Sequence, residues 1–296
     1  MQAQKVVTRK KKKRIPITPY IIWGVPLIFM SMFSFYPLIK TIISSFSITT
    51  QYGKFIRFYG LGNWARMFQN GDLPETIRTT LVFAVMSFTL SFVVAMLFAI
   101  FCSNKGKGSR IYQTLFALPM VIATAPIAAI WAFMFRQNAG LVNQVLGTNL
   151  AWTMNKETAL YVVSIVTAWG HVASNYLYLL VGFRNVPDEL IEAAHIDGAG
   201  WWTRTFRIMI PMASPQIFYV VFLNIIWSLK VFTQIRLLTY GGPGRTTTTL
   251  MYDIYNRGTV LGQFEYACCE ALVLFLMIFI ATRVQFAFEK KLVHYN

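Results

Sequence analysis

Charged residues are scarce in this chain. Only 13% of its 296 residues are Asp, Glu, Lys or Arg, whereas 56% are hydrophobic. Soluble globular domains contain about 25% charged residues, so this composition excludes an ordinary soluble enzyme. The high apolar fraction also excludes an intrinsically disordered chain, since such chains lack the residues needed to form a core.

Cysteine is rare, and the usual signatures of catalysis are missing. Cys102, Cys268 and Cys269 lie in or beside apolar runs without metal-ligand spacing, so we expect neither a disulfide framework nor a metal site. The sequence has no G-x-x-x-x-G-K-[ST] loop for binding nucleotide phosphates. No catalytic triad is recognisable either. We therefore expect no catalytic residue and no cofactor in the chain itself.

Long apolar runs are what the sequence has instead. About 20 residues are needed for a helix to cross the hydrocarbon core of a bilayer. Six runs approach or exceed this length, at residues 15–39, 79–104, 111–135, 158–183, 208–229 and 266–282. The predicted fold is an all-α membrane protein with six transmembrane helices, comprising a basic leader at 1–14 and a membrane domain at 15–296.

The positive charges orient these helices. Six spans place both termini on one side of the membrane, and the segments on that side hold 16 of the 27 Lys and Arg residues. Loops rich in Lys and Arg stay in the cytoplasm. We therefore predict that both termini are cytoplasmic in a multi-pass protein of a bacterial cell membrane.

The predicted cytoplasmic segment 184–215 differs from the other loops because it concentrates four of the eleven acidic residues. Pro187 suits the first turn of a helix, and Asp188 and Glu189 place negative charge at its positive end. Gly198 and Gly200 would end this helix after about 10 residues. An exposed acidic and apolar helix favours docking to a protein. A helix lying flat on the bilayer is the alternative, although such helices usually carry Lys and Arg on their polar face.

The same segment resembles the EAA loop of ABC-importer permeases. That pattern is Glu-Ala-Ala, three residues, Gly, nine residues, and Ile-x-Leu-Pro. All of these spacings are present in this chain, and the only departure is Ile210 in place of the usual leucine. The matching positions are Glu192, Ala193, Ala194, Gly198, Ile208, Met209, Ile210 and Pro211. The Gly-Gly-Pro segment at 241–243 also resembles the maltose-permease-like carbohydrate uptake branch, closest to its sugar and glycerol-3-phosphate permeases.

This resemblance implies a permease subunit that imports a carbohydrate oligosaccharide or a glycerol phosphate. The coupling helix between helices 4 and 5 would transmit closure of a cytoplasmic ATPase, through Glu192, Ala193, Ala194, Asp197, Gly198 and Ala199. The implied partners are a second permease, two copies of the ATPase and an extracytoplasmic solute-binding protein. ATP and Mg would bind to the ATPase, so the chain itself is not expected to be an enzyme.

Polar and aromatic residues inside the apolar runs are candidates for the solute pathway. Sugars are held by hydrogen bonds and aromatic stacking, and suitable groups are Asn175, Tyr176, Tyr178, Asn224, Trp227 and Ser228. The same residue types also join transmembrane helices or form interfacial belts, so both interpretations stay open. Lys230 and Arg236 could attract an anion or could be interfacial snorkelling residues.

Charge leaves two further alternatives open. The predicted outer segments carry a net positive charge, which would suit either an anionic solute or an acidic docking surface on a solute-binding protein. An ion-coupled secondary transporter is the alternative function, and it would need ionisable groups within the membrane. Only Glu270 and His171 fit that requirement, and the sequence shows no partner for either residue.

Overall fold

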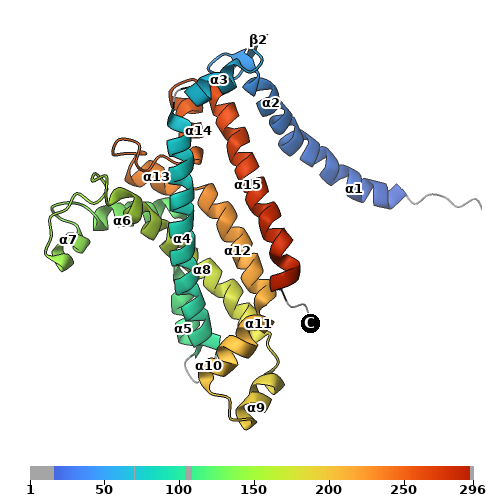
Figure 1. Ribbon diagram of the computed structural model, residues 1–296, viewed down its shortest axis with the longest axis vertical. Coiled ribbons are helices and arrows are strands. Elements are labelled where there is room, and N and C mark those ends of the chain that lie inside the picture. Colours follow the sequence, from blue (N-terminus) through green and yellow to red (C-terminus); the bar gives the residue numbers. More distant parts are fainter. Residues whose placement is uncertain (1–16, 70, 104–108, 294–296) are drawn as a thin grey trace, which may run out of the picture.

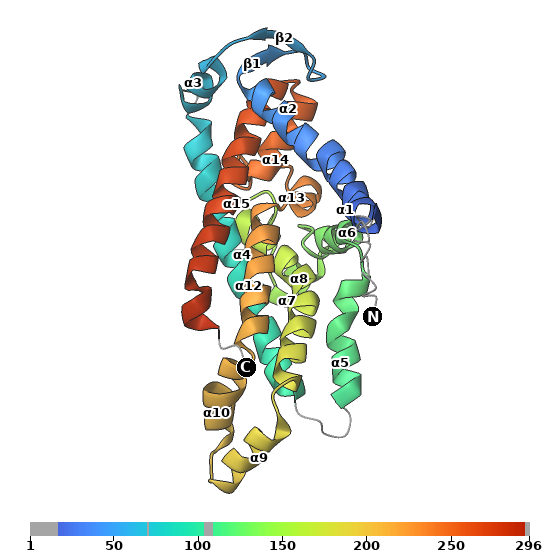
Figure 2. The same ribbon diagram turned by 90° about the vertical axis from the view of Figure 1, so that its right-hand side faces the viewer.

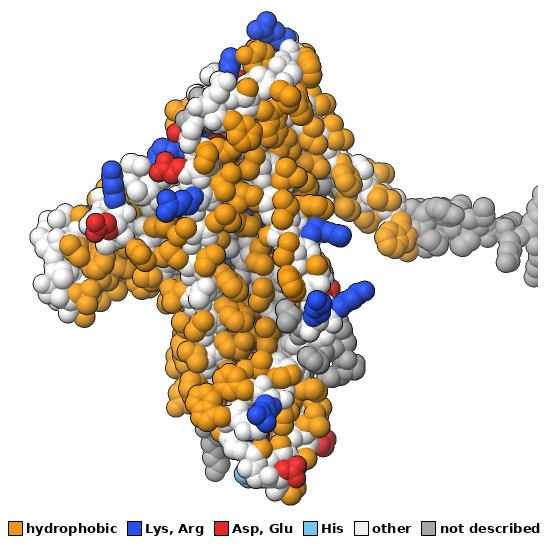
Figure 3. Space-filling model, viewed as in Figure 1, with side chains coloured by type: hydrophobic (Ala, Val, Ile, Leu, Met, Phe, Trp, Pro, Cys, Tyr) orange, Lys and Arg blue, Asp and Glu red, His pale blue; other side chains and the backbone are white. Residues whose placement is uncertain are grey.

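The computed structural model describes residues 17–69, 71–103 and 109–293. The basic leader at 1–14 and most of the first predicted cytoplasmic loop lie outside the described residues. The chain is almost entirely helical (Figure 1), and α4 and α15 run along the long axis with α8 and α12 beside them (Figures 1 and 2). Hydrophobic side chains cover most of the face seen in Figure 3, as a lipid-facing surface requires.

The elements follow the predicted runs closely. Four of the six runs form single extended helical segments, whereas two are broken by a bend. The elements are α1 (Ile17–Met30), η1 (Ser31–Phe35), α2 (Tyr36–Ser45), β1 (Ser47–Thr49), β2 (Phe55–Phe58), α3 (Gly62–Gln69), α4 (Asp72–Ser103), α5 (Ser109–Ala117), η2 (Leu118–Val121), α6 (Thr124–Met134), α7 (Leu141–Leu146), α8 (Ala159–Arg184), α9 (Asp188–Ile196), α10 (Trp201–Arg204), η3 (Thr205–Met209), α11 (Ile210–Met212), α12 (Ser214–Leu229), α13 (Thr233–Leu238), α14 (Leu250–Tyr255), η4 (Asn256–Val260) and α15 (Phe264–Leu292).

Three helical segments are long and apolar enough to cross a membrane, at Ile22–Ser45, Asp72–Ser103 and Phe264–Lys291. The number rises to five if each bent pair is counted as one span. The remaining predicted run is α8, a continuous helix of 26 residues. It has 15 buried residues, including Asn175, and packs extensively along α4. A helix surrounded by other helices can carry polar residues that a lipid-facing helix cannot.

The third predicted span is not the straight helix that the sequence suggested. It bends by 96° between Ile111–Val121 and Thr124–Met134. Pro119 lies in the 3-10 turn η2, and Ile122 and Ala123 are extended with ψ angles of 128° and 153°. Proline removes a backbone donor and obstructs the preceding turn, so continuous hydrogen bonding through this run is lost.

The fifth predicted span also contains a bend. It bends by 69° between Trp201–Met212 and Ser214–Leu229. The break falls at Ala213, between Pro211 and Pro215. Each proline occupies an early position of the helix that contains it, where its missing N–H costs least. The two prolines therefore favour two short helices rather than one long helix.

A small two-stranded sheet was not predicted from the sequence. Antiparallel strands β1 and β2 pair Ser47 with Phe58 and Ile48 with Arg57, and a bulge follows Ile48. The hairpin lies at one end of the long axis, and α9 lies at the other (Figure 2). Asn63 fixes its base by donating hydrogen bonds to the carbonyl oxygens of Ser45 (3.1 Å) and Ser47 (2.8 Å).

Three apolar clusters form the core. One joins α4, α8 and α12 around Ala95, Tyr176 and Val220. A second lies between α6, α8 and α13, and a third joins α3, α4 and α14 to α15. In contrast, α1 projects away from the other helices (Figure 1), and none of the apolar window in Ile22–Ser45 is buried.

Candidate functional site

The segment with EAA spacing folds as a short helix followed by a glycine turn, as predicted. Helix α9 has nine residues, with Asp188 and Glu189 in its first turn after Pro187. Gly198 N–H donates to the His195 carbonyl (3.1 Å) and Ala199 N–H donates to the Ala194 carbonyl (2.9 Å). These two bonds form a Schellman motif. Gly198 has a φ of +76°, which explains why glycine is needed at this position.

Helix α9 projects from the end of the helical bundle (Figures 1 and 2) and has no buried residue. Glu192, Ala193, Asp197 and Gly198 are exposed, whereas Ala194 and Ala199 are half-buried. Ile196 is 86% exposed at the end of this helix. The projecting helix therefore presents both acidic and apolar side chains on its exposed surface.

An aromatic stack connects α9 to the membrane helices. Trp201 and Trp202 follow the glycine turn and make an edge-on contact with ring centroids 4.8 Å apart. Trp202 stacks on Phe206 (5.5 Å), and Trp201 stacks on Phe101 of α4 (6.5 Å). Each such pair adds about 0.5–1.5 kcal/mol beyond burial. The stack therefore joins α10, which follows the glycine turn after α9, to α4 and to η3.

Two of the predicted pathway residues bind each other. Asn175 of α8 and Asn224 of α12 exchange two side-chain hydrogen bonds of 3.1 and 2.8 Å. Ser91 of α4 donates a third to the Asn224 side-chain oxygen (3.1 Å). Both asparagines are buried, with exposed fractions of 0% for Asn175 and 2% for Asn224. This arrangement joins three helices, so within this chain it matches the helix-packing interpretation that the sequence left open.

The other pathway candidates lie in different surroundings. Ser228 donates to the Asn224 carbonyl of its own helix (2.7 Å), and Tyr176 is buried. The Tyr176 ring makes an edge-on contact with Phe116 of α5 (5.8 Å). Tyr178 is 37% exposed and makes an edge-on contact with Tyr219. Trp227 is half-buried. The candidates therefore do not form a single cluster.

Trp227 lies at a cavity of about 220 Å³ where α12 ends. The imidazole of His171 stacks on its indole with ring centroids 4.9 Å apart and planes 12° apart. The cavity is also lined by Thr124, Lys230, Thr233 and Gln234. Hydroxyl, amide, ammonium and aromatic groups are the set that would bind a small polyhydroxy anion. Sequence reasoning did not single out Thr124, Thr233 or Gln234, because each is an ordinary helix-end residue.

Two breaks in helical structure border this cavity. Thr124, which follows the extended residues before α6, and the link from Lys230 to Phe232 between α12 and α13 both contribute to its lining. His171 is the thirteenth of the 26 residues of α8, about 18 Å from each end of that helix. Non-helical backbone at such depth is tolerated where it is buried in protein or lines a water-filled cavity.

Glu270 is buried and paired with a basic residue. It is 0% exposed, and its carboxylate lies 3.3 Å from Nε of Arg257. The same guanidinium contacts Asp253 (3.2 Å) and Asp72 (2.8 Å). Arg245 joins the cluster through Asp253 (2.9 Å). This cluster was not predicted, since its members are far apart in the sequence and come from α4, η4, α14, α15 and a loop.

Charge balance explains how this cluster tolerates burial. Burial would lower the pKa of Arg257, but the carboxylates of Asp253 and Glu270 outweigh that effect, so the pKa is raised above its ordinary value. Arg257 also lies over the ring of Tyr266, 4.2 Å from its centroid. Glu270 is therefore paired with a cation. It is not the free carboxylate within the membrane that the secondary-transporter alternative would need.

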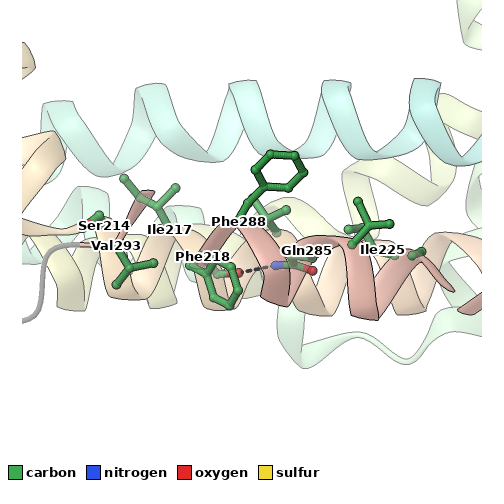
Figure 4. A pocket seen from close by; sticks show the side chains of 10 residues that line it. Ser214, Ile217, Phe218, Ile225, Gln285, Phe288 and Val293 are labelled. Atoms are coloured by element: carbon green, nitrogen blue, oxygen red, sulfur yellow. Dashed lines mark hydrogen bonds between the residues drawn. The ribbon is translucent and has the colours of Figure 1, made fainter. Parts of the chain in front are cut away.

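A groove between α12 and α15 has an apolar lining. Its volume is about 450 Å³, and Ile217, Phe218 and Phe288 contribute to its walls (Figure 4). The side-chain N–H of Gln285 donates to the Phe218 carbonyl (3.0 Å) across the groove. This surface suits an acyl chain or an apolar helix rather than a polyhydroxy solute.

Within the described ranges, no three His, Cys, Asp or Glu side chains come together as metal ligands. All three cysteines are buried and free.

Comparison with known proteins identifies relatives over nearly the whole chain. The family described as "Binding-protein-dependent transport system inner membrane component" matches residues 95–294. The sn-glycerol-3-phosphate transport system permease protein UgpA of Yersinia enterocolitica is 31% identical over 282 residues, covering 94% of this chain and 96% of the relative. UgpA of Salmonella typhimurium is 30% identical with the same coverage.

Solved structures share the fold. One chain in the crystal structure of a bacterial alginate ABC transporter, in complex with an alginate pentasaccharide-bound periplasmic protein, matches with a TM-score of 0.81. It is 19% identical, and the match covers 93% of this chain and 94% of that chain. A chain of the methionine transporter MetNI is more distant, with a TM-score of 0.52, 15% identity, and coverage of 73% and 95%.

Proposed function

The chain belongs to the family of inner-membrane components of binding-protein-dependent transport systems, and we propose that it imports glycerol phosphate or an oligosaccharide. It is a permease subunit of an ABC importer. The UgpA relatives are named for sn-glycerol 3-phosphate, and one structural neighbour is described as importing the acidic polysaccharide alginate. Both solutes are polyhydroxy anions, which is the chemistry that the cavity at Trp227 and Lys230 suits.

The observation that carries this proposal is α9, an exposed helix with intact EAA spacing at one end of the fold. We infer that Glu192, Ala193, Ala194, Asp197, Gly198 and Ala199 form the coupling surface. Closure of an ATPase around this surface would displace α9 as a rigid body. Through the aromatic stack on Phe101 and the bent segment before α12, this displacement would shift the equilibrium between the inward-open and outward-open states of the membrane pathway.

The proposed topology has six spans with both termini in the cytoplasm. The spans are the α1–α2 run, α4, the bent α5–α6 pair, α8, the bent α10–α12 segment and α15. Helix α8 is about 39 Å long, which exceeds the thickness of the hydrocarbon core. The excess of Lys and Arg on the α9 side supports this orientation.

We assign solute contact to the cavity at the outer end of α12. Trp227 and His171 would provide an aromatic surface for a sugar or glycerol backbone, and Lys230 would attract its negative charge. Tyr178, which is exposed beside Tyr219, would extend the pathway toward the α9 end. Asn175, Asn224, Ser228 and Tyr176 would contribute by shaping its wall, because they are buried between helices.

The proposed assembly contains a second permease, two ATPase copies that bind ATP and Mg, and an extracytoplasmic solute-binding protein. The experiment is purification of this assembly and measurement of ATP hydrolysis with solute and binding protein. Glu192→Lys should abolish solute-stimulated hydrolysis, since it reverses charge on the coupling surface. Glu157→Lys makes the same charge change at an exposed site in the α7–α8 link and should leave hydrolysis unchanged. Equal stimulation of both variants would contradict the assignment of α9.

Solute contact is tested separately. Lys230→Gln should raise the solute concentration needed for half-maximal uptake, because it removes the cation from the cavity. Lys156→Gln is the matched control at another exposed lysine. If the two variants transported the solute equally well, the cavity would not be part of the pathway.

A further inference from the structure

Three residues beyond the end of α12 form a cluster that the cavity at Trp227 does not include. The guanidinium of Arg236 in α13 lies over two tyrosine rings, with its Cζ 5.0 Å from the ring centroid of Tyr240 and 5.5 Å from that of Tyr255 in α14. We call these three residues the arginine–tyrosine platform. The Tyr240 side chain is 63% exposed, whereas Arg236 and Tyr255 are half-buried. Arg236 is therefore packed against its own fold and still within reach of a ligand.

The hydrogen-bond donors of Arg236 are not used within the described part of the chain. A guanidinium carries five N–H donors. No residue that the structure describes forms an ion pair with Arg236 or accepts a hydrogen bond from its side chain. Asp253, the acidic residue of α14, is buried and contacts Arg245 and Arg257 instead. Stacking covers the flat face of a guanidinium and leaves its edge free, and that edge binds a phosphate or carboxylate through two parallel hydrogen bonds.

Tyr240 has a backbone conformation that tyrosine seldom adopts. Its φ of +52° lies in the left-handed region, which glycine enters without strain. Two hydrogen bonds hold this conformation. The Tyr240 N–H donates to the Ile235 carbonyl (2.8 Å), and the Tyr240 carbonyl accepts from the Tyr252 hydroxyl (2.9 Å). Backbone strain of this kind is concentrated at ligand sites, and here the strained residue carries the exposed ring of the platform.

One aromatic ring connects the platform to the cavity at Trp227. Phe232 lines that cavity, and its ring makes an edge-on contact with Tyr255, with centroids 4.8 Å apart. Helices α13 and α14 lie between the end of α12 and the hairpin end of the fold in both views (Figures 1 and 2). In the proposed topology, a solute that approaches from the hairpin side would therefore meet the platform before the cavity.

We propose that the arginine–tyrosine platform is an outer binding site for the anionic group of a polyhydroxy solute. This inference rests on the proposed function, because that function supplies the solute and makes the hairpin end the outer one. The edge of Arg236 binds the phosphate or carboxylate, and the exposed ring of Tyr240 packs against the carbon skeleton of glycerol or a sugar. Lys230 in the cavity then attracts the same negative charge as the solute moves inward. The platform would favour an anionic solute over a neutral one at the entrance.

The test follows chemical modification of arginine by phenylglyoxal in the purified assembly, without ATP or binding protein, in nanodiscs of uncharged lipid. Peptide mass spectrometry gives the modification rate of each arginine. Glycerol 3-phosphate and an alginate oligosaccharide are the anionic probes, and glycerol is the neutral control. At least one anionic probe should slow the modification of Arg236 at least fivefold, whereas glycerol should not. Arg57, exposed in the hairpin, is the internal control and should react at the same rate throughout.

Two variants of Tyr240 separate binding from structure. Tyr240→Gly removes the ring and places in the left-handed conformation a residue that adopts it without strain, so the protein should stay folded while protection of Arg236 is lost. Tyr240→Phe keeps the ring and should keep the protection. Equal protection in the two variants would contradict a role of the ring in binding.

Three outcomes would overturn the proposed site. They are the absence of protection by both anionic probes, equal protection by glycerol, and protection only when phosphatidylglycerol is added to the nanodiscs, since Arg236 would then bind a lipid headgroup. ATP-driven uptake by the unmodified assembly is measured separately. Failure to accumulate solute would refute the proposed function, whereas protection of Arg236 by an anionic probe would still support the binding site.

Discussion

Gly198 offers the sharpest test of how α9 is built. Its φ of +76° lies in the left-handed region, whereas Gly200, two residues later, has a φ of −67°. A Cβ added at either glycine would meet no described atom within 4 Å, so substitution by alanine creates no clash. Space for a Cβ is therefore available at both positions, but only Gly198 has a left-handed backbone. The left-handed conformation costs an L-residue about 1–2 kcal/mol.

Gly198→Ala should therefore lower the population of the native turn about 5- to 30-fold, relative to alternative conformations. If α9 couples ATP hydrolysis to transport through this turn, solute-stimulated hydrolysis should fall by up to the same factor. Gly200→Ala should behave like the unmodified protein. Gly198→Asn should have a rate of solute-stimulated hydrolysis between those of Gly198→Ala and Gly200→Ala, because asparagine adopts the left-handed conformation more readily than alanine.

The assay is solute-stimulated ATP hydrolysis by the purified assembly, with the amount of folded permease checked by size-exclusion chromatography. A similar loss of solute-stimulated hydrolysis in Gly198→Ala and Gly200→Ala would mean that coupling does not depend on the left-handed turn. Unchanged hydrolysis in Gly198→Ala would refute the reasoning outright.

Two further predictions concern stability. Arg257→Ala leaves Asp253 and Glu270 buried without their shared cation, so it should destabilise the protein by about 3–5 kcal/mol; thermal unfolding in detergent should show a much smaller effect for the exposed Arg57→Ala. A double-mutant cycle of Asn175→Ala and Asn224→Ala should give a coupling free energy of about 0.6–1.7 kcal/mol in chemical unfolding, the range for hydrogen bonds between membrane helices. Zero coupling together with impaired uptake would instead place these residues in the solute pathway.

Local features of the fold were predictable because short-range chemistry determines them. Apolar runs correctly located the long helices, and the turn at Gly198 followed from the need for a residue that tolerates positive φ. The bends were less accessible. Pro119, Pro211 and Pro215 were visible, but a proline near a helix end and a proline that breaks a span look alike in sequence.

Long-range contacts were not predictable from one sequence. Glu270 was recognised as unusual, yet its partner Arg257 lies in a loop that sequence reasoning treated only as outer and basic. Asn175 and Asn224 were selected for their polarity in apolar runs, and that polarity alone does not distinguish a pathway from a helix contact. The hairpin was missed because β1 and β2 are only three and four residues long.

The central claim, ATP-driven import through this subunit, is tested most directly by uptake into proteoliposomes. The complete assembly is reconstituted with ATP and Mg on the α9 side, and labelled glycerol 3-phosphate or acidic oligosaccharide is supplied with the binding protein on the hairpin side. With all ion gradients collapsed, the account predicts accumulation that requires ATP and is lost in Glu192→Lys. Accumulation that needs an ion gradient and proceeds without ATP would contradict it.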